Sequence, residues 1–333
     1  MVSRLLIVSA ITKKSIVSRV MAIVLLLLVV LQLIVNRIKV DGDRSLIVGG
    51  VAVDSIEKYP FFGVLIGTRQ YLNEFGNATV RSTVLCGGSL IATDVLLTMG
   101  TCLDYDDLVQ VHVVLEIVNF IEGERQVIQA ENWSINNFEF DKDRKLAIVY
   151  LMNPAVNVEI ANPSVHDEND MELNDKLTTM GYGVTDEFND PNLENAVNSD
   201  FLMEVDIRVK DTEACAEDYE KTLIEAAQFC AGGGYSGTGA CLGDAGGPAI
   251  DENGDLVGVV SIGIIECGIY PTVFTRVNGY KNFIKDAVCN RTGIVDPIWC
   301  DPNPPPPPFF GICFAESNQI QVKNEEGGNR NSK

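Results

Sequence analysis

The chain has 333 residues, with 46 acidic and 25 basic side chains and a formal net charge of −21 at pH 7. A nucleic-acid surface needs clustered lysine and arginine to neutralise phosphates, so this composition argues against nucleic acid as a partner. The charge favours solubility and would suit a basic protein partner.

The N-terminal part contains an apolar run, Val20–Val35, which follows Lys13, Lys14 and Arg19. The run is shorter than the ~20 residues of a membrane-spanning helix and suits the hydrophobic part of a secretory signal. Residues 36–40 offer no small-residue cleavage site, so an uncleaved signal anchor is the alternative. We expect residues 1–46 to be a signal plus a short pro-segment. Either route places the rest of the chain outside the cell or in the lumen, as a secreted or a single-pass membrane protein.

The central part of the chain is a series of short β-branched segments separated by turns, a pattern typical of an all-β protein. The clearest strand candidates are 61–67, 95–99, 109–118, 146–151 and 256–265. After the last strand, apolar residues recur at helical spacing and predict a closing helix. These residues are Val277, Tyr280, Phe283, Ile284 and Val288.

A tail of residues 289–333 follows the predicted helix. It contains an uninterrupted proline run, Pro304–Pro308, which favours a stiff polyproline II conformation. We interpret this run as a spacer; a docking segment for an aromatic-lined groove is the alternative.

Nine short motifs resemble, in order and spacing, those of the trypsin/chymotrypsin serine protease family. They are IVGG at 47–50, CGGSLI at 86–91, LTMGTC at 97–102, KLAIVYL at 145–151, GYG at 181–183, FCAG at 229–232, GDAGGP at 243–248, SIG at 261–263 and PTVFTRV at 271–277. Residues 47–288 are therefore identified as a member of this family. The resemblance implies two packed six-stranded antiparallel β-barrels, divided near Pro154, and a C-terminal helix.

The resemblance also implies that the catalytic serine, histidine and aspartate of the family fall on Ala245, Thr101 and Lys145. Alanine has no attacking hydroxyl, threonine is no base near neutral pH, and lysine would repel an imidazolium. We therefore expect no catalytic residue. The two histidines, His112 in a strand pattern and His166 in an acidic loop, are not expected to replace the missing base.

A Thr101–Lys145 dyad is the alternative chemistry, by analogy with serine–lysine hydrolases. The oxyanion-hole amides implied by the resemblance, those of Gly243 and Ala245, argue against it because they surround the missing serine. The implied specificity pocket falls on Gly239, Ile262, Gly263 and Thr272, and it is altered at all of these except Gly263. Gly239 replaces the aspartate of trypsin-like members, Ile262 replaces a tryptophan, and the branched side chain of Thr272 should intrude into the pocket.

Asp244 is retained, and in the family this aspartate pairs with the amino group freed at the position of Ile47. Cleavage after Arg44 would leave two extra residues before Ile47, so the pair would need a cut after Leu46. We interpret Ile47 and Asp244 as inherited structure; a switchable, zymogen-like conformer is the alternative.

The cysteines indicate an oxidising compartment. The resemblance implies the disulfides Cys86–Cys102, Cys215–Cys230 and Cys241–Cys267. Cys289, Cys300 and Cys313 remain, and this odd set predicts one internal bridge and one free or intermolecular thiol. Three tripeptides, at Asn77, Asn132 and Asn290, are glycosylation acceptors in a secreted chain.

These observations favour a secreted, non-catalytic protease homologue that binds an extracellular protein as a cofactor, decoy or regulator in a protease cascade. The alternatives are a hydrolase with residual or displaced activity at Thr101 and Lys145, and a defunct gene product. No metal-ligand cluster or phosphate loop stands out, so we expect neither a metal nor a cofactor. Contact with a membrane is expected only through an uncleaved N-terminal anchor.

Overall fold

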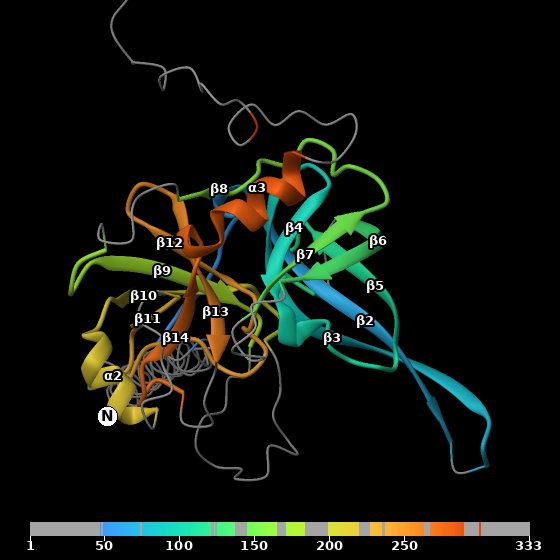
Figure 1. Ribbon diagram of the computed structural model, residues 1–333, viewed down its shortest axis with the longest axis horizontal. Coiled ribbons are helices and arrows are strands. Elements are labelled where there is room, and N and C mark those ends of the chain that lie inside the picture. The colour runs from blue at the N-terminus through green and yellow to red at the C-terminus, as the bar shows by residue number, and fades with distance from the viewer. Residues whose placement is uncertain are drawn as a thin grey trace, which may run out of the picture.

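The computed structural model describes residues 47, 49–73, 75–120, 123, 125–136, 145–164, 171–183, 199–219, 227–234, 237–262, 267–289 and 300. Several features predicted from the sequence lie outside these residues: Val20–Val35, His166, Gly263, Asn290, Pro304–Pro308 and Cys313. Figure 1 shows two groups of strands side by side, with a short helix, α3 (Lys281–Cys289), at one end of the molecule. The predicted all-β fold with a closing helix is confirmed.

The first group is a closed antiparallel barrel in the order β2-β3-β4-β7-β6-β5. Its strands are β2 (Phe62–Leu72), β3 (Ala78–Ala92), β4 (Val95–Met99), β5 (Leu108–Leu115), β6 (Gln126–Ile135) and β7 (Leu146–Leu151). Apolar side chains of every strand fill the interior, among them the fully buried Leu65, Leu97 and Ile148. The expected six-stranded barrel is therefore present in the first half of the chain.

The second group differs from the expected six-stranded barrel, because it is an eight-stranded sheet in the order β1-β10-β9-β12-β13-β14-β11 with β8 paired to β13. Its strands are β1 (Val51–Ala52), β8 (Asn162–Pro163), β9 (Lys176–Gly181), β10 (Met203–Arg208), β11 (Gln228–Ala231), β12 (Pro248–Asp251), β13 (Asp255–Ile262) and β14 (Thr272–Arg276). Six strands form the central part, and the two-residue strands β1 and β8 are added to it. A single bridge, between Val209 and Ala231, joins the ends of β10 and β11.

The N-terminal segment belongs to this second sheet, although it precedes the first barrel in the chain. Val51 in β1 pairs with Glu204 in β10, and Ile47 is fully buried in the apolar core of the second sheet. The expected boundary, with the first barrel starting at Ile47, is therefore wrong for residues 47–52. Backbone pairing to β10, a contact between distant parts of the sequence, decides this placement.

Tyr182 connects the two halves of the molecule. Its hydroxyl donates a hydrogen bond to the Ile117 carbonyl oxygen at 2.7 Å, and burial raises its pKa above the usual value. Its ring lies 4.6 Å from that of Phe120 and 6.0 Å from that of Phe62, measured between centroids. The middle residue of the Gly-Tyr-Gly motif thus packs the second half against the first.

The helical elements are short. They are η1 (Ile56–Lys58), η2 (Gly100–Cys102), α2 (Thr212–Asp218), η5 (Asn278–Tyr280) and α3. The Asp211 carboxylate caps α2 by accepting a hydrogen bond from the Ala214 N–H at 2.8 Å. The predicted closing helix begins as the 3₁₀ turn η5 and continues as α3. Ile284 and Val288 of α3 are buried in the apolar core that also contains the interior of the first barrel.

The described residues form four disulfides, with Cα–Cα distances of 5.3–6.4 Å. Three of them, Cys86–Cys102, Cys215–Cys230 and Cys241–Cys267, are the pairs that the family resemblance implies. The fourth, Cys289–Cys300, ties the end of α3 to the chain that follows it and is the expected internal bridge. A free or intermolecular thiol at Cys313 stays a prediction.

Within the described part of the chain, no helix has both the length and the apolar character needed to cross a membrane.

Candidate functional site: a degenerate protease centre

Three structural connections bring the family's catalytic positions together. β4 and β7 are neighbours, so the Gly100 N–H donates to the Lys145 carbonyl oxygen at 2.6 Å beside Thr101 in η2. The Gly87 N–H donates to the Ala245 carbonyl oxygen at 2.9 Å. The Cys86–Cys102 disulfide then connects the residues next to Gly87 and Thr101. The fold therefore gathers all three positions although none carries the family's side chain.

The side chains of Thr101 and Lys145 are half-buried. Across the described ranges, no hydrogen bond or ion pair joins the Thr101 hydroxyl or the Lys145 ammonium to another residue. A nucleophilic hydroxyl requires a base within hydrogen-bond reach. In this arrangement no base contacts the hydroxyl of Thr101.

In the turn before β12, the backbone N–H groups of Gly243 and Ala245 have no acceptor among the described residues. The Asp244 N–H donates to the Cys241 carbonyl oxygen at 3.0 Å, and the Gly247 N–H donates to the Asp244 carbonyl oxygen at 2.9 Å. The N–H groups of Gly243 and Ala245 donate to no other residue that the structure describes. Gly243 has a φ of 96°, in the region that favours glycine. The turn can therefore still offer amide donors to an oxygen, but it has no hydroxyl to attack a carbonyl.

The Asp244 carboxylate lies beneath this turn and is buried. It accepts hydrogen bonds from the Gly183 N–H at 2.7 Å and the Cys241 N–H at 2.8 Å. Burial raises the pKa of Asp244 to about 6, although these two hydrogen bonds favour the charged form. Ile47 is buried as well; the activation pair of Ile47 and Asp244 stays a prediction.

The raised pKa of Asp244 gives a testable pH dependence. The pKa rises from the model-compound value of 3.8 to about 6, so between these values the folded protein binds more protons than the unfolded chain. Stability should therefore fall as pH rises through this window, by roughly 3 kcal/mol, and stay constant above it. Asp244→Asn should lack this component. Urea unfolding of the parent and of Asp244→Asn from pH 4 to pH 7 measures this loss of stability. Parallel curves of unfolding free energy against pH for the two proteins would contradict the prediction.

Thr272 lies beside Gly239, another position of the implied specificity pocket. Its side chain is buried, and its Oγ1 accepts a hydrogen bond from the Ala240 N–H at 3.0 Å. The same Oγ1 lies 2.9 Å from the position that a Cβ on Gly239 would take. Thr272 thus occupies space beside Gly239, where the resemblance implied a pocket. Ile262 is the last residue of β13, and the structure does not describe its side chain.

The hydrogen bond of Thr272 predicts different effects for two substitutions. Thr272→Val removes the acceptor and leaves the buried Ala240 N–H without a partner, which should cost about 1–3 kcal/mol of unfolding free energy. Thr272→Ser keeps the acceptor and should cost less. Thermal and urea unfolding measure the stability of both variants. A serine variant as unstable as the valine variant would show that the methyl group of Thr272 contributes as much to stability as its hydrogen bond.

His112 does not approach this centre. It lies on β5, which is three strands away from β4 in either direction around the barrel. His112 therefore lies on another part of the barrel wall.

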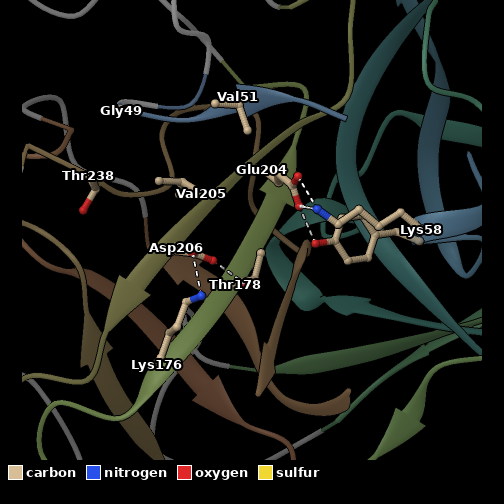
Figure 2. Close-up of a pocket in the computed structure, with 10 residues that line it drawn as sticks. Gly49, Val51, Lys58, Lys176, Thr178, Glu204, Val205, Asp206 and Thr238 are labelled. Atoms are coloured by element: carbon tan, nitrogen blue, oxygen red, sulfur yellow. Dashed lines mark hydrogen bonds and ion pairs between the residues drawn. The ribbon is translucent and has the colours of Figure 1, made fainter. Parts of the chain in front are cut away.

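A cavity of about 450 Å³ lies elsewhere, where η1, β1, β9 and β10 meet, and Figure 2 shows it. The Glu204 carboxylate binds the Lys58 ammonium and accepts a hydrogen bond from Tyr59. Asp206 pairs with Lys176 at 2.8 Å, so each of the lining carboxylates has a cation beside it. The contacts of Glu204 with Lys58 and Tyr59 therefore connect η1 to β10. Each carboxylate that lines the cavity is neutralised by a neighbouring lysine.

These paired charges around the cavity could not be predicted from the sequence. The only signal in the sequence is the i, i+2 spacing of Lys176 with Thr178 and of Glu204 with Asp206, which places each pair on one face of its strand. The pairing of β9 with β10 brings the two faces together, with Thr178 opposite Asp206.

The predicted glycosylation acceptors that the structure describes are both exposed. Asn77 lies in the turn between β2 and β3, and Asn132 lies on β6. Their use in the secreted protein stays a prediction.

Comparison with known proteins identifies the family. The sequence profile described as trypsin matches residues 64–284. The chain belongs to the trypsin-like serine protease family. It is 29% identical to glucanase inhibitor protein 2 of Phytophthora sojae over 74% of this chain and 82% of that protein. It is also 29% identical to serine protease Hayan of Drosophila melanogaster, over 65% of this chain and 36% of that protein.

A solved structure supports the fold. This trypsin family member superposes on mouse neuropsin, a serine protease, with a TM-score of 0.57. The match covers 72% of this chain and 98% of neuropsin at 21% sequence identity. At this identity, the likeness establishes the shared fold.

Proposed function

We propose that this trypsin family member is a secreted, non-catalytic protease homologue that acts by binding another extracellular protein. The observation that carries the proposal is Ala245, which puts a methyl group where the family has its nucleophilic hydroxyl. Thr101 cannot replace the family's histidine base, and Lys145 would repel an imidazolium rather than orient it. Fold and chemistry can separate in this way because barrel packing does not use these side chains.

The relatives support a binding role. Several of them, from Phytophthora sojae and Phytophthora infestans, are named glucanase inhibitor proteins, a name that describes inhibition of another enzyme. Four disulfides in the described chain are typical of an oxidising, extracellular compartment. The partner that we propose is an extracellular protein, with this chain acting as a cofactor, decoy or regulator in a protease cascade.

A second candidate function is hydrolysis through Thr101 and Lys145. The hydrogen bond from the Gly100 N–H to the Lys145 carbonyl oxygen favours this second candidate, because it holds Thr101, which follows Gly100, close to the backbone of Lys145. The amides of Gly243 and Ala245 oppose it, because in the family they serve the position of Ala245.

The decisive experiment is an assay of the secreted protein against a mixed peptide library. We expect no cleavage by the parent, by Ala245→Ser or by Thr101→Ala, with an active family member as the positive control. Losing a serine protease triad lowers turnover on the order of a million-fold. Cleavage by the parent that disappears in both Thr101→Ala and Lys145→Ala would overturn the proposal in favour of the second candidate.

A further inference from the structure

Strands β2 and β3 continue beyond the barrel as a two-stranded ribbon. β5 pairs with β2 only as far as Arg69, and β4 pairs with β3 only from Ser89. Between these limits β2 and β3 pair with each other as far as Leu72 and Ala78. Figure 1 shows this hairpin, which we call the ribbon (residues 69–86), reaching away from the body of the molecule.

Contacts at its base and its tip hold the ribbon in shape. Arg69 Nε donates to Asp107 Oδ1 at 2.7 Å, and its guanidinium lies 4.4 Å from the centroid of the Tyr105 ring. At the tip, Asn73 Oδ1 accepts hydrogen bonds from the N–H groups of Phe75 at 3.0 Å and of Asn77 at 2.9 Å. The ribbon is therefore preorganised, which lowers the entropy cost of binding through it.

The outer edge of the ribbon has no partner strand. From Ala78 to Cys86, β3 pairs with β2 alone among the described residues, so its other edge presents unpaired N–H and C=O groups. Four apolar side chains are exposed on the ribbon: Val80 (65% exposed) on β3 itself, Tyr71 (47%) and Leu72 (70%) on β2, and Phe75 (86%) in the turn. Exposed strand edges with apolar side chains pair readily with another strand. A two-stranded hairpin alone is only marginally stable in water, so additional strands would stabilise the ribbon.

The charge of the ribbon permits a second copy of this chain as the partner. Residues 60–93 contain one acidic residue, Glu74, and two basic ones, Arg69 and Arg81, in a chain that holds 46 acidic residues. Two copies of so acidic a protein repel each other over most of their surface. The ribbon is a place where they can approach without that repulsion.

We propose that the ribbon edge of β3, Ala78–Val84, pairs with the same edge of a second copy of this chain. The two ribbons then form one four-stranded antiparallel sheet about a two-fold axis, an isologous contact. An axis at Arg81 would set two arginines directly opposite each other, which is unfavourable. The axis therefore falls near Val80 or Ser82, and Val80 becomes covered. This inference does not depend on the absence of catalysis.

The first test is the molecular mass of the secreted protein by analytical ultracentrifugation over a range of concentrations. The parent should form dimers, and Val80→Lys should weaken the dimer roughly tenfold or more, because lysine protects strand edges. Val127→Lys is the matched control. Val127 is 56% exposed on β6, which pairs with β5 on one side and β7 on the other, so this substitution should leave dimerisation unchanged.

The second test locates the axis. Val80→Cys, Ser82→Cys and the control Val127→Cys are each prepared with Cys313→Ser, and the ribbon cysteine at the axis should form a disulfide-linked dimer under mild oxidation. Val127→Cys should not. A parent that remains monomeric up to about 100 µM overturns the proposal and leaves the ribbon to a different protein. Equal weakening by Val80→Lys and Val127→Lys, or cross-linking by neither ribbon cysteine in a dimeric protein, also overturns it.

Discussion

Combining Thr101→His, Lys145→Asp and Ala245→Ser should make this chain react covalently with an organophosphate probe of serine hydrolases, whereas the parent should not react. The backbone contacts that gather these positions are all present: Gly100 to Lys145, Gly87 to Ala245, and the Cys86–Cys102 disulfide. The substitutions supply a hydroxyl, a base and a group that orients the base. General base assistance contributes about 10²–10⁴-fold, so Ala245→Ser alone should react slower by that factor.

Mass spectrometry of the labelled protein measures the rate and the modified residue. Probe reaction is preferable to peptide turnover here, because Thr272 occupies the implied pocket and would impede substrate in every variant. A matched control combines Thr101→Ala, Lys145→Asp and Ala245→Ser, which restores the hydroxyl without a base. If the histidine and alanine versions react equally slowly, the loss of chemistry extends beyond three side chains to the scaffold itself.

Gly181→Ala should prevent the protein from folding, or destabilise it by more than about 3 kcal/mol. A Cβ at Gly181 would stand 2.0 Å from Asp244 Oδ1, and one at Gly183 would stand 2.4 Å from Oδ2. Asp244 is buried and cannot move aside without losing its two amide hydrogen bonds. Yield of secreted protein and its urea unfolding free energy measure the effect.

A double-mutant cycle with Asp244→Ala tests the stated cause. When Gly181→Ala is already present, removing the carboxylate also removes the clash, so Asp244→Ala should cost less there than in the parent. Gly254→Ala is a useful control, since nothing lies within 4 Å of its Cβ position and only the strain of its positive φ remains. Purely additive effects of Gly181→Ala and Asp244→Ala would contradict the proposed contact.

The Gly-Tyr-Gly motif shows how far the sequence alone could explain a residue. The motif was recognisable as a family signature, but its two glycines are required by a carboxylate more than 60 positions later in the chain. Likewise Tyr182 could be read as a replacement for tryptophan, whereas its role in joining the two halves depends on Ile117 and Phe120. The sequence identifies such residues, and only the fold supplies their neighbours.

The sequence by itself determined the family, the all-β class, the positions of most predicted strands and the chemistry missing at Thr101, Lys145 and Ala245. These are local properties, because strand patterns and the functional groups of side chains are readable within a few residues. Only the tertiary structure decided that β1 joins the second sheet and that paired charges on η1, β9 and β10 surround one cavity. It also decided that the start of β3 pairs with β2 alone among the described residues. These features depend on pairing between distant segments, and local patterns do not encode which strand edges meet.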